Sequence, residues 1–373
     1  MSEPLAVLDS YPPECHPTRV ESLGSAGGMS GAQFWRITAP RGVLALRRWP
    51  AEFPSADRLA FIHAVLRHAA KRGIDFLPIP ATTQTGHSFI FHDNHFWELA
   101  PWMPGIADYE FAPTAEKPAA AMRALAQFHT AVADFPSPFS VGDNAESPRT
   151  NSQSAIHRHT HRLQQLFGTA LTTLTRSINE TTWPALVPIA RQFVATLPES
   201  IPSALAQLEP LLTAHLPLQP CLRDIWHDHL LFTGDEVTGL IDFGAVDIDT
   251  PATDIARLIG SLEQGAVPFS SRNKTAPAPP LLTTQPQVSK RGLSPSPTSA
   301  ISEESQTWQQ ALTAYQSIHP LSPSEIEAAY ALAKSGNILA GCNWIRWIYI
   351  EGRHFDDEAQ VVERFRRIAA RVG

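Results

Sequence analysis

Short runs of alternating apolar and polar residues occupy the N-terminal quarter of the chain, and this period of two is typical of half-buried β-strands. The runs lie at Val20–Leu23, Gln33–Ile37, Val43–Arg47, 88–92 and 96–100. From Ser55 to Arg72 the apolar period becomes that of a helix, which Gly73 ends. We therefore expect a small antiparallel sheet with one helix over residues 18–100, preceded by an extension over residues 1–17.

Beyond residue 106 the apolar residues recur at helical spacing, so the remainder of the chain is predicted to be mainly helical. Helices are expected at about 115–133, 152–178, 184–197, 200–214, 251–263, 304–316, 323–350 and 356–371. The proline-bounded run 101–105 forms a stiff connector between the two regions. The fold class is α+β, with a sheet lobe and a helical lobe at 106–373.

One segment of the helical region has a different composition. Residues 266–303 are rich in Pro, Ser and Thr and have few large apolar residues, so we expect a disordered insertion there. A docking or regulatory tail with Ser-Pro phosphosites is the alternative, and a neutral solvated loop is favoured.

Charge and cysteine usage restrict the function class. A net charge of −7 opposes a dominant role at nucleic acid or at a membrane surface. Cys15, Cys221 and Cys342 are far apart, with neither zinc spacing nor a disulfide framework, which fits a reducing cytoplasm. We expect no signal peptide and no transmembrane helix. The sequence leaves the oligomeric state undetermined.

The candidate chemistry is concentrated at residues 222–244. Asp224 lies on a short polar loop, and Asp242 follows an apolar strand. Between them, two apolar runs flank a Thr233-Gly234-Asp235 turn, the pattern of a β-hairpin. Such a hairpin brings two carboxylates and His229 to one end of a small sheet. This arrangement suits a metal–nucleotide site with a base for a hydroxyl group.

Leu222-Arg223-Asp224 and Asp242-Phe243-Gly244 resemble the H-R-D and D-F-G motifs of kinase-like phosphotransferases. Together with 237–244 and Pro251–Ala256, they make the chain similar to the aminoglycoside phosphotransferase and choline kinase-like family. The resemblance extends from about residue 18 to the C-terminus. It implies a two-lobed protein-kinase-like fold and ATP-dependent transfer of the γ-phosphate to a hydroxyl of a small molecule, such as an aminoglycoside, choline or homoserine.

By this resemblance Asp224 is the catalytic base and Asp242 a metal ligand. His229 stands where the family has an asparagine that binds a second metal. Because imidazole suits manganese better than magnesium, we expect ATP with Mg²⁺, or with Mn²⁺ through His229. Three interpretations stay open: His229 binds a metal, it holds Asp224, or the second metal site is lost or supplied by Asp228. Leu222 also departs from the family, which has histidine there.

The nucleotide-binding residues come from the sheet lobe. The glycine-rich run 24–31 is expected to cover the phosphates, with Gly27, Gly28 and Ser30 as its contacts. Arg47 stands in place of the family's lysine on the third strand, with Arg48 as the alternative. Its acidic partner is unassigned, since Asp57 and His63 are the only nearby helix candidates. Glu98 and Ala100 are expected to meet the adenine edge through their main chain.

Several histidines and arginines remain as weaker candidates. His129 is interpreted as structural, and His157, His159 and His161 as a solvated helix face rather than a metal site. On the late helix, Trp344 and Trp347 are expected in the core. Arg346, Arg353 and His354 are candidates to meet an anionic acceptor.

Two other functions remain open. A nucleotide-binding pseudokinase or scaffold is favoured by Leu222, His229 and the unassigned acid, and opposed by the intact Asp224 and Asp242. A protein serine/threonine kinase is opposed because Thr250-Pro251 follows the metal strand almost at once, with no recognisable A-P-E segment.

Overall fold

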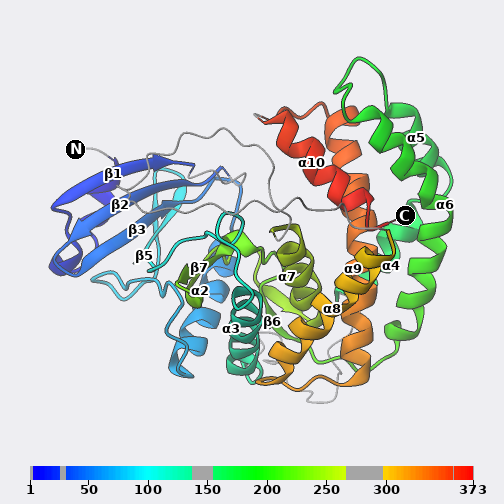
Figure 1. Cartoon of the computed structure of the whole chain (residues 1–373). Coiled ribbons are helices and arrows are strands. Elements are labelled where there is room, and N and C mark those ends of the chain that lie inside the picture. Colours follow the sequence, from blue (N-terminus) through cyan, green and yellow to red (C-terminus); the bar gives the residue numbers. More distant parts are fainter. Residues whose placement is uncertain (1–2, 26–30, 137–153, 266–296, 356, 373) are drawn as a thin grey trace, which may run out of the picture.

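The computed structural model describes residues 3–25, 31–136, 154–265, 297–355 and 357–372. Figure 1 shows a β-sheet at one side of the molecule and a group of helices at the other, with helices α2 (Ala56–Lys71) and α3 (Lys117–Val132) between them. Gly27, Gly28, Ser30 and residues 266–296 of the expected insertion lie outside the described residues.

The sheet has five antiparallel strands in the order β1-β2-β3-β5-β4. They are β1 (Arg19–Gly24), β2 (Gln33–Ala39), β3 (Gly42–Arg48), β4 (Ile90–His92) and β5 (His95–Pro101). Each expected run forms a strand. The Ser55 side chain caps α2 by accepting the N–H of Arg58. In β2, β3 and β5 the buried residues alternate with more exposed ones, as the sequence pattern predicts, whereas β1 and β4 contain no buried residue.

Residues ahead of β1 belong to the core of the sheet. Helix α1 (Glu3–Leu8) and a short 3-10 turn at Pro13–Cys15 pack on it. Val7, Leu8, Tyr11 and Cys15 are buried in one cluster with side chains of β2, β3 and β5. The described part of the expected extension is therefore packed rather than trailing.

The helices beyond the connector follow the expected pattern, with differences at glycine and proline. They are α4 (Ala155–Gln165), α5 (Thr169–Ser177), α6 (Val187–Leu208), α7 (Ala252–Gly265), α8 (Pro297–Gln316), α9 (Pro323–Ile345) and α10 (Glu358–Ala369). The single helix expected at 152–178 is divided at Gly168, whose φ of +73° no helix residue adopts.

Helix α6 is continuous where two helices were expected. It contains Pro198 and Pro202, spaced by about one turn, and continues into a 3-10 turn at Glu209–Leu212. Helix α8 begins at Pro297, ahead of the expected 304, so residues 297–303 of the expected insertion are helical. Proline fits the first turn of a helix because the N–H it lacks has no partner there.

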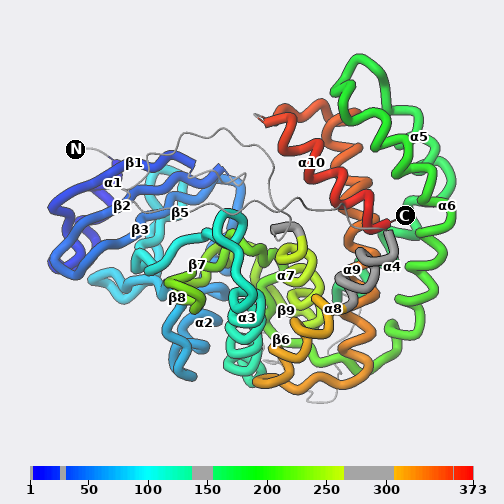
Figure 2. Tube along the Cα trace, viewed as in Figure 1, coloured from blue at the N-terminus to red at the C-terminus, as the bar shows by residue number. Residues whose placement is uncertain are grey.

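The connector after β5 is docked on the predicted hairpin, which forms as β7 (Leu230–Thr233) and β8 (Glu236–Leu240). The N–H groups of Ile106 and Phe232 each donate to the other residue's carbonyl at 2.9 Å. Gly105 has a φ of +93°, and a Cβ there would lie 2.8 Å from the carbonyl oxygen of Phe232. Only glycine fits this close approach, which holds the hairpin beside the sheet, as the trace in Figure 2 shows.

No helix of the described residues is long and apolar enough to cross a membrane.

Candidate active site

The loop that carries Asp224 is held from behind by Asp254, near the start of α7. The Asp254 carboxylate accepts the main-chain N–H of Leu222 at 2.6 Å and that of Arg223 at 2.7 Å. Arg223 has a φ of +63°, a strained conformation for a non-glycine residue. The two bonds offset that strain, so a buried carboxylate determines the path of the main chain immediately before Asp224.

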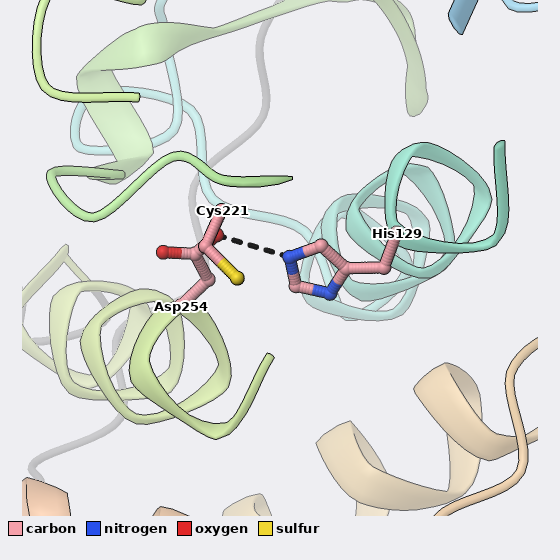
Figure 3. Close-up of side chains that lie close together, drawn as sticks. All are labelled: His129, Cys221 and Asp254. Atoms are coloured by element: carbon pink, nitrogen blue, oxygen red, sulfur yellow. Dashed lines mark hydrogen bonds and ion pairs between the residues drawn. The ribbon is translucent and has the colours of Figure 1, made fainter. Parts of the chain in front are cut away.

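Asp254 is fixed in turn by His129 of α3. Figure 3 shows His129, Cys221 and Asp254 side by side, with His129 Nε2 at 3.0 Å from a carboxylate oxygen of Asp254. The other ring nitrogen accepts from the hydroxyl of Tyr315 at 2.6 Å. His129 is completely buried, as the structural interpretation of this residue requires.

The same three side chains lie close enough together for a metal site, but their chemistry opposes one. Both carboxylate oxygens of Asp254 accept hydrogen bonds, and both nitrogens of His129 are occupied. Burial raises the pKa of the Cys221 thiol, and Asp254 and Asp249 raise it further, so the metal-binding thiolate is disfavoured. The cluster is a hydrogen-bonded support for the loop.

Asp224 has one carboxylate oxygen bound by two donors. Trp226 Nε1 donates to it at 3.0 Å, and the guanidinium of Arg257 in α7 forms an ion pair with it. Burial alone would raise the pKa of Asp224, but the charge of Arg257 and the bond from Trp226 lower it below its ordinary value. About half of the side chain is exposed, on a cavity of about 400 Å³.

Asp242 and His229 face each other at the end of the hairpin. His229 Nε2 lies 3.7 Å from a carboxylate oxygen of Asp242, and Nδ1 of His229 is buried without a hydrogen-bond partner among the described residues. Asp242 has a φ of +63°, so it too holds a strained conformation. Two ligands of one cation, each about 2.1 Å from it, lie about 3–4 Å apart. The pair therefore fits one shared divalent cation.

The contacts of Asp224 and Asp228 bear on the three interpretations of His229. Among the described residues, Asp224 takes its hydrogen bonds from Trp226 and Arg257, and none is formed with His229. Asp228 contacts His227 at 3.1 Å rather than Asp242. The contacts therefore oppose the interpretation in which His229 holds Asp224, and metal binding by His229 stays a prediction.

The acidic partner of Arg47 is Glu98. Strand pairing places Glu98 of β5 directly opposite Arg47 of β3, with 3.9 Å between guanidinium and carboxylate. The other Glu98 oxygen lies 2.7 Å from Nε2 of His63 in α2. Burial opposes the charge of Glu98, yet His63 and Arg47 lower its pKa. The second guanidinium nitrogen of Arg47 lies 3.7 Å from Asp242, so Arg47 also reaches the candidate metal site.

Arg48 and Ala100 lie elsewhere. Arg48 points away from Arg47 and pairs with Glu3 at 3.0 Å, as alternation along a strand requires. Ala100 lies opposite Ala45 inside the β3–β5 ladder. The contacts of Glu98 and Ala100 with adenine stay predictions.

An ion-pair chain links α2 to the catalytic loop, and no pattern in the sequence predicted it. Arg58 of α2 lies 3.2 Å from Asp247 of strand β9 (Asp247–Asp249), which pairs with β6 (Gln219–Cys221). The same Asp247 carboxylate accepts from Arg223 at 2.8 Å. Helix α2 is thereby connected through Asp247 to Arg223, the residue before Asp224.

The late-helix candidates are not at the cavity. Arg346 and Arg353 both pair with Glu351 at 2.8 Å, on the surface. Trp344 is buried in the core as expected, Trp347 packs against the same core, and both also line the cavity. Of the three clustered histidines, His159 also lines it, while His157 and His161 bond to Ser154 and Gln165, so the three share no centre.

Comparison with known proteins places this site in a family. Residues 24–273 match the model of a family described as the phosphotransferase enzyme family. A homoserine kinase of Beijerinckia indica subsp. indica is 25% identical over 238 residues, which are 62% of this chain and 61% of that kinase. The chain thus spans about three fifths of that relative's length.

Solved structures share the fold at low sequence identity. An aminoglycoside phosphotransferase from Alicyclobacillus acidocaldarius subsp. acidocaldarius superposes with a TM-score of 0.62 at 16% identity, over 100% of this chain and 93% of that one. A spectinomycin phosphotransferase, solved with ADP and spectinomycin, has a TM-score of 0.56 at 10% identity, over 96% and 93%. An amicoumacin kinase, solved with AMP-PNP and Ca²⁺, has a TM-score of 0.59 at 12% identity, over 98% and 91%. The expected α+β kinase-like fold is confirmed.

Proposed function

The chain belongs to the phosphotransferase enzyme family, and we propose that it transfers the γ-phosphate of ATP to a hydroxyl group of a small molecule. One observation carries the proposal. Arg47 from the sheet and His229 from the hairpin both lie 3.7 Å from the carboxylate of Asp242, and Asp224 of the adjoining loop opens onto a cavity. Phosphoryl transfer needs these groups together: a cation for the phosphates, metal ligands and a carboxylate near the acceptor.

In this mechanism Asp224 orients the acceptor hydroxyl and accepts its proton. The hydroxyl oxygen bonds to the γ-phosphorus as the bond from that phosphorus to the bridging oxygen breaks. ADP leaves with the bridging oxygen, and the proton passes from Asp224 to water. The lowered pKa makes Asp224 a weak base, which suits a residue whose main role is to orient the hydroxyl. In the loose transition state of phosphoryl transfer the hydroxyl has lost little of its proton, so the reaction does not require a strong base.

Asp242 and His229 would hold a divalent cation, which when bound neutralises charge on the phosphates. Arg47 would hold phosphate oxygens, and Glu98, which is itself bound by His63, pairs with its guanidinium near the end of β3. Since imidazole is a poor magnesium ligand, we include Mn²⁺ beside Mg²⁺ as the metal of this site.

The acceptor is a small molecule in this proposal. The cavity beside Asp224 is enclosed by helices, and α7 begins at Ala252, soon after Asp242, which leaves little room for a peptide-binding segment. Homoserine, from the named relative, and antibiotic alcohols, from the named structures, are the first candidates. A cytoplasmic location, where ATP and free cysteines coexist, is part of the proposal.

ADP release, measured with ATP and a panel of alcohols in Mg²⁺ and in Mn²⁺, tests the function. Asp224→Asn should abolish acceptor-dependent turnover while ATP binding is retained. Asp235→Asn, an exposed carboxylate in the hairpin turn, is the matched control and should turn over normally. ATP binding without turnover in either metal would favour the pseudokinase.

A further inference from the structure

The cavity beside Asp224 is built from side chains of four helices. It has a volume of about 400 Å³ and lies between α4, α7, α9 and α10. Trp226, Trp344 and Trp347 supply large apolar walls. Asp224 belongs to the site already described, whereas the cavity also has charged groups for which the phosphoryl-transfer step has no use.

Positive charge is in excess on these walls. Arg162 of α4, Arg257 of α7 and Arg364 of α10 line the cavity, against Asp224 as the one lining carboxylate. Asp224 is already engaged by Arg257. Among the described residues, the other two arginines therefore have no carboxylate partner, in a chain whose net charge is −7.

Arg364 is the better placed of the two. Its guanidinium lies over the ring of Trp226 at 4.5 Å and near that of Trp344 at 5.9 Å. The side chain is half-buried, and burial lowers its pKa, which Asp228 and Asp224 oppose from a distance. Within the part of the chain that the structure describes, Arg364 forms no ion pair, since Asp228 contacts His227 instead. A partly desolvated cation without a carboxylate is costly unless a ligand supplies one.

Arg162 of α4 also lines the cavity and is exposed, with one side-chain hydrogen bond to a described residue. It donates to the side-chain oxygen of Asn343 at 2.8 Å, and it forms no ion pair with any described residue. A guanidinium has five N–H groups in a planar fork, so most of its donors remain free for a planar carboxylate or for phosphate oxygens.

His159 lines the same cavity but carries no positive charge. Burial and the neighbouring Arg158, Arg162 and Arg257 lower its pKa to about 3, so it is uncharged at neutral pH. Its Nδ1 lies 2.8 Å from the hydroxyl of Ser335, which donates to the carbonyl of Ala331. The excess positive charge of the cavity therefore comes from arginine alone.

Resting on the proposed function, we propose that the acceptor carries a negatively charged group beside its hydroxyl, and that Arg364 and Arg162 bind this group. The acceptor is a hydroxylated carboxylic acid or phosphate ester whose hydroxyl reaches Asp224. A polycationic acceptor would meet two unpaired arginines, so polycationic aminoglycosides are the wrong charge for this cavity.

The first experiment uses the full-length protein, ATP and matched acceptors in an ADP-release assay. 4-Hydroxybutanoate, glycerate and glycerol phosphate are each compared with an uncharged amide or alcohol of the same length. Homoserine, whose carboxylate is accompanied by an ammonium group, is compared with its cationic amide. We expect kcat/KM to be at least about tenfold higher for the anionic member of the preferred pair, the size of one charge-assisted hydrogen bond. The carboxylates and the phosphate ester separate the two sources of negative charge.

Variants then assign the effect. Arg364→Gln should raise KM for the anionic acceptor about 10–100-fold and leave KM for ATP unchanged, with Arg364→Lys recovering part of the loss. Arg191→Gln, which removes a surface arginine paired with Glu180 away from the cavity, is the matched control and should change neither constant. Equal or higher kcat/KM for uncharged or cationic acceptors would overturn the inference and leave the proposed function standing.

A binding measurement separates the two failures because it needs no turnover. Tryptophan fluorescence of the protein, with three tryptophans at the cavity, is titrated with glycerate and with glycerol phosphate at constant ionic strength. A saturable change that Arg364→Gln abolishes supports the inference even if no acceptor releases ADP, in which case the proposed function fails. A titration without saturation by either anion overturns the inference.

Discussion

Replacement of Gly105 by alanine is expected to destabilise the junction between the connector and the hairpin that carries the candidate metal ligands. Gly105 has a φ of +93°, and a Cβ would lie 2.5 Å from the hydroxyl of Thr238 and 2.8 Å from the carbonyl oxygen of Phe232. The Thr238 hydroxyl can rotate away only by losing its hydrogen bonds to Thr233 and to the carbonyl of Pro104. The Phe232 carbonyl cannot, because it accepts the N–H of Ile106.

The magnitude follows from two separable contributions. An L-residue in this left-handed region costs about 1–2 kcal/mol. The overlap with Phe232 adds about 1–3 kcal/mol, the usual cost of overpacking a fixed contact. Gly73 separates the two contributions, since its φ is +94° and a Cβ there meets nothing within 4 Å. Gly73→Ala should therefore lose only the first contribution.

Urea unfolding of both variants, followed by fluorescence, measures the difference in the free energy of unfolding through the midpoint and slope. We expect Gly105→Ala to be less stable than Gly73→Ala by about 1–3 kcal/mol. If the two variants lost the same stability within about 0.5 kcal/mol, the close approach would not constrain this position.

Three further predictions concern the site. Asp254→Asn replaces one carboxylate oxygen behind the catalytic loop by an N–H donor, so kcat in the ADP-release assay should fall about 100-fold with unchanged circular dichroism; an unaltered kcat would show that the loop needs no such support. His229→Asn should lower the ratio of Mn²⁺- to Mg²⁺-supported rates about tenfold, and a constant ratio would remove His229 from the metal site. Arg257→Gln should move the acid limb of the pH profile of kcat/KM to higher pH. The wild-type pKa of Asp224 is lowered, so activity is lost only as pH falls through that low value, and without Arg257 the loss begins sooner. A limb that stays in place would show that another group controls it.

Local pattern predicted the secondary structure well where one period persisted. The strands β2, β3 and β5 and the hairpin β7–β8 lie where alternation and turn residues placed them. Prediction failed where a single glycine or proline could either end a helix or be accommodated within it. Gly168 divided an expected helix, while Pro198 and Pro202 left α6 whole. Each outcome depends on packing around the residue, which periodicity does not contain.

The sequence predicted the residues of the candidate site but not the contacts that these residues make with one another. Asp224, Asp242, His229 and Arg47 came from motif spacing, and the fold brings the last three together. Glu98 was expected to meet the adenine edge through its main chain. Strand register places its side chain opposite Arg47, which identifies Glu98 as the acidic partner that the sequence left unassigned. Register is a property of two strands, so neither strand's sequence alone reveals it.

The sequence by itself determined the strands, most helices and the kinds of side chain that phosphoryl transfer requires, because these follow from short-range period and motif spacing. Only the tertiary structure decided where charge is paired and where it is left over. Arg162, Arg257 and Arg364 stand on three helices far apart in the chain, and nothing in their local sequence separates them from surface arginines such as Arg353. Coulomb energy depends on distance through space and on burial, so their excess over the single lining carboxylate exists only once the helices have packed.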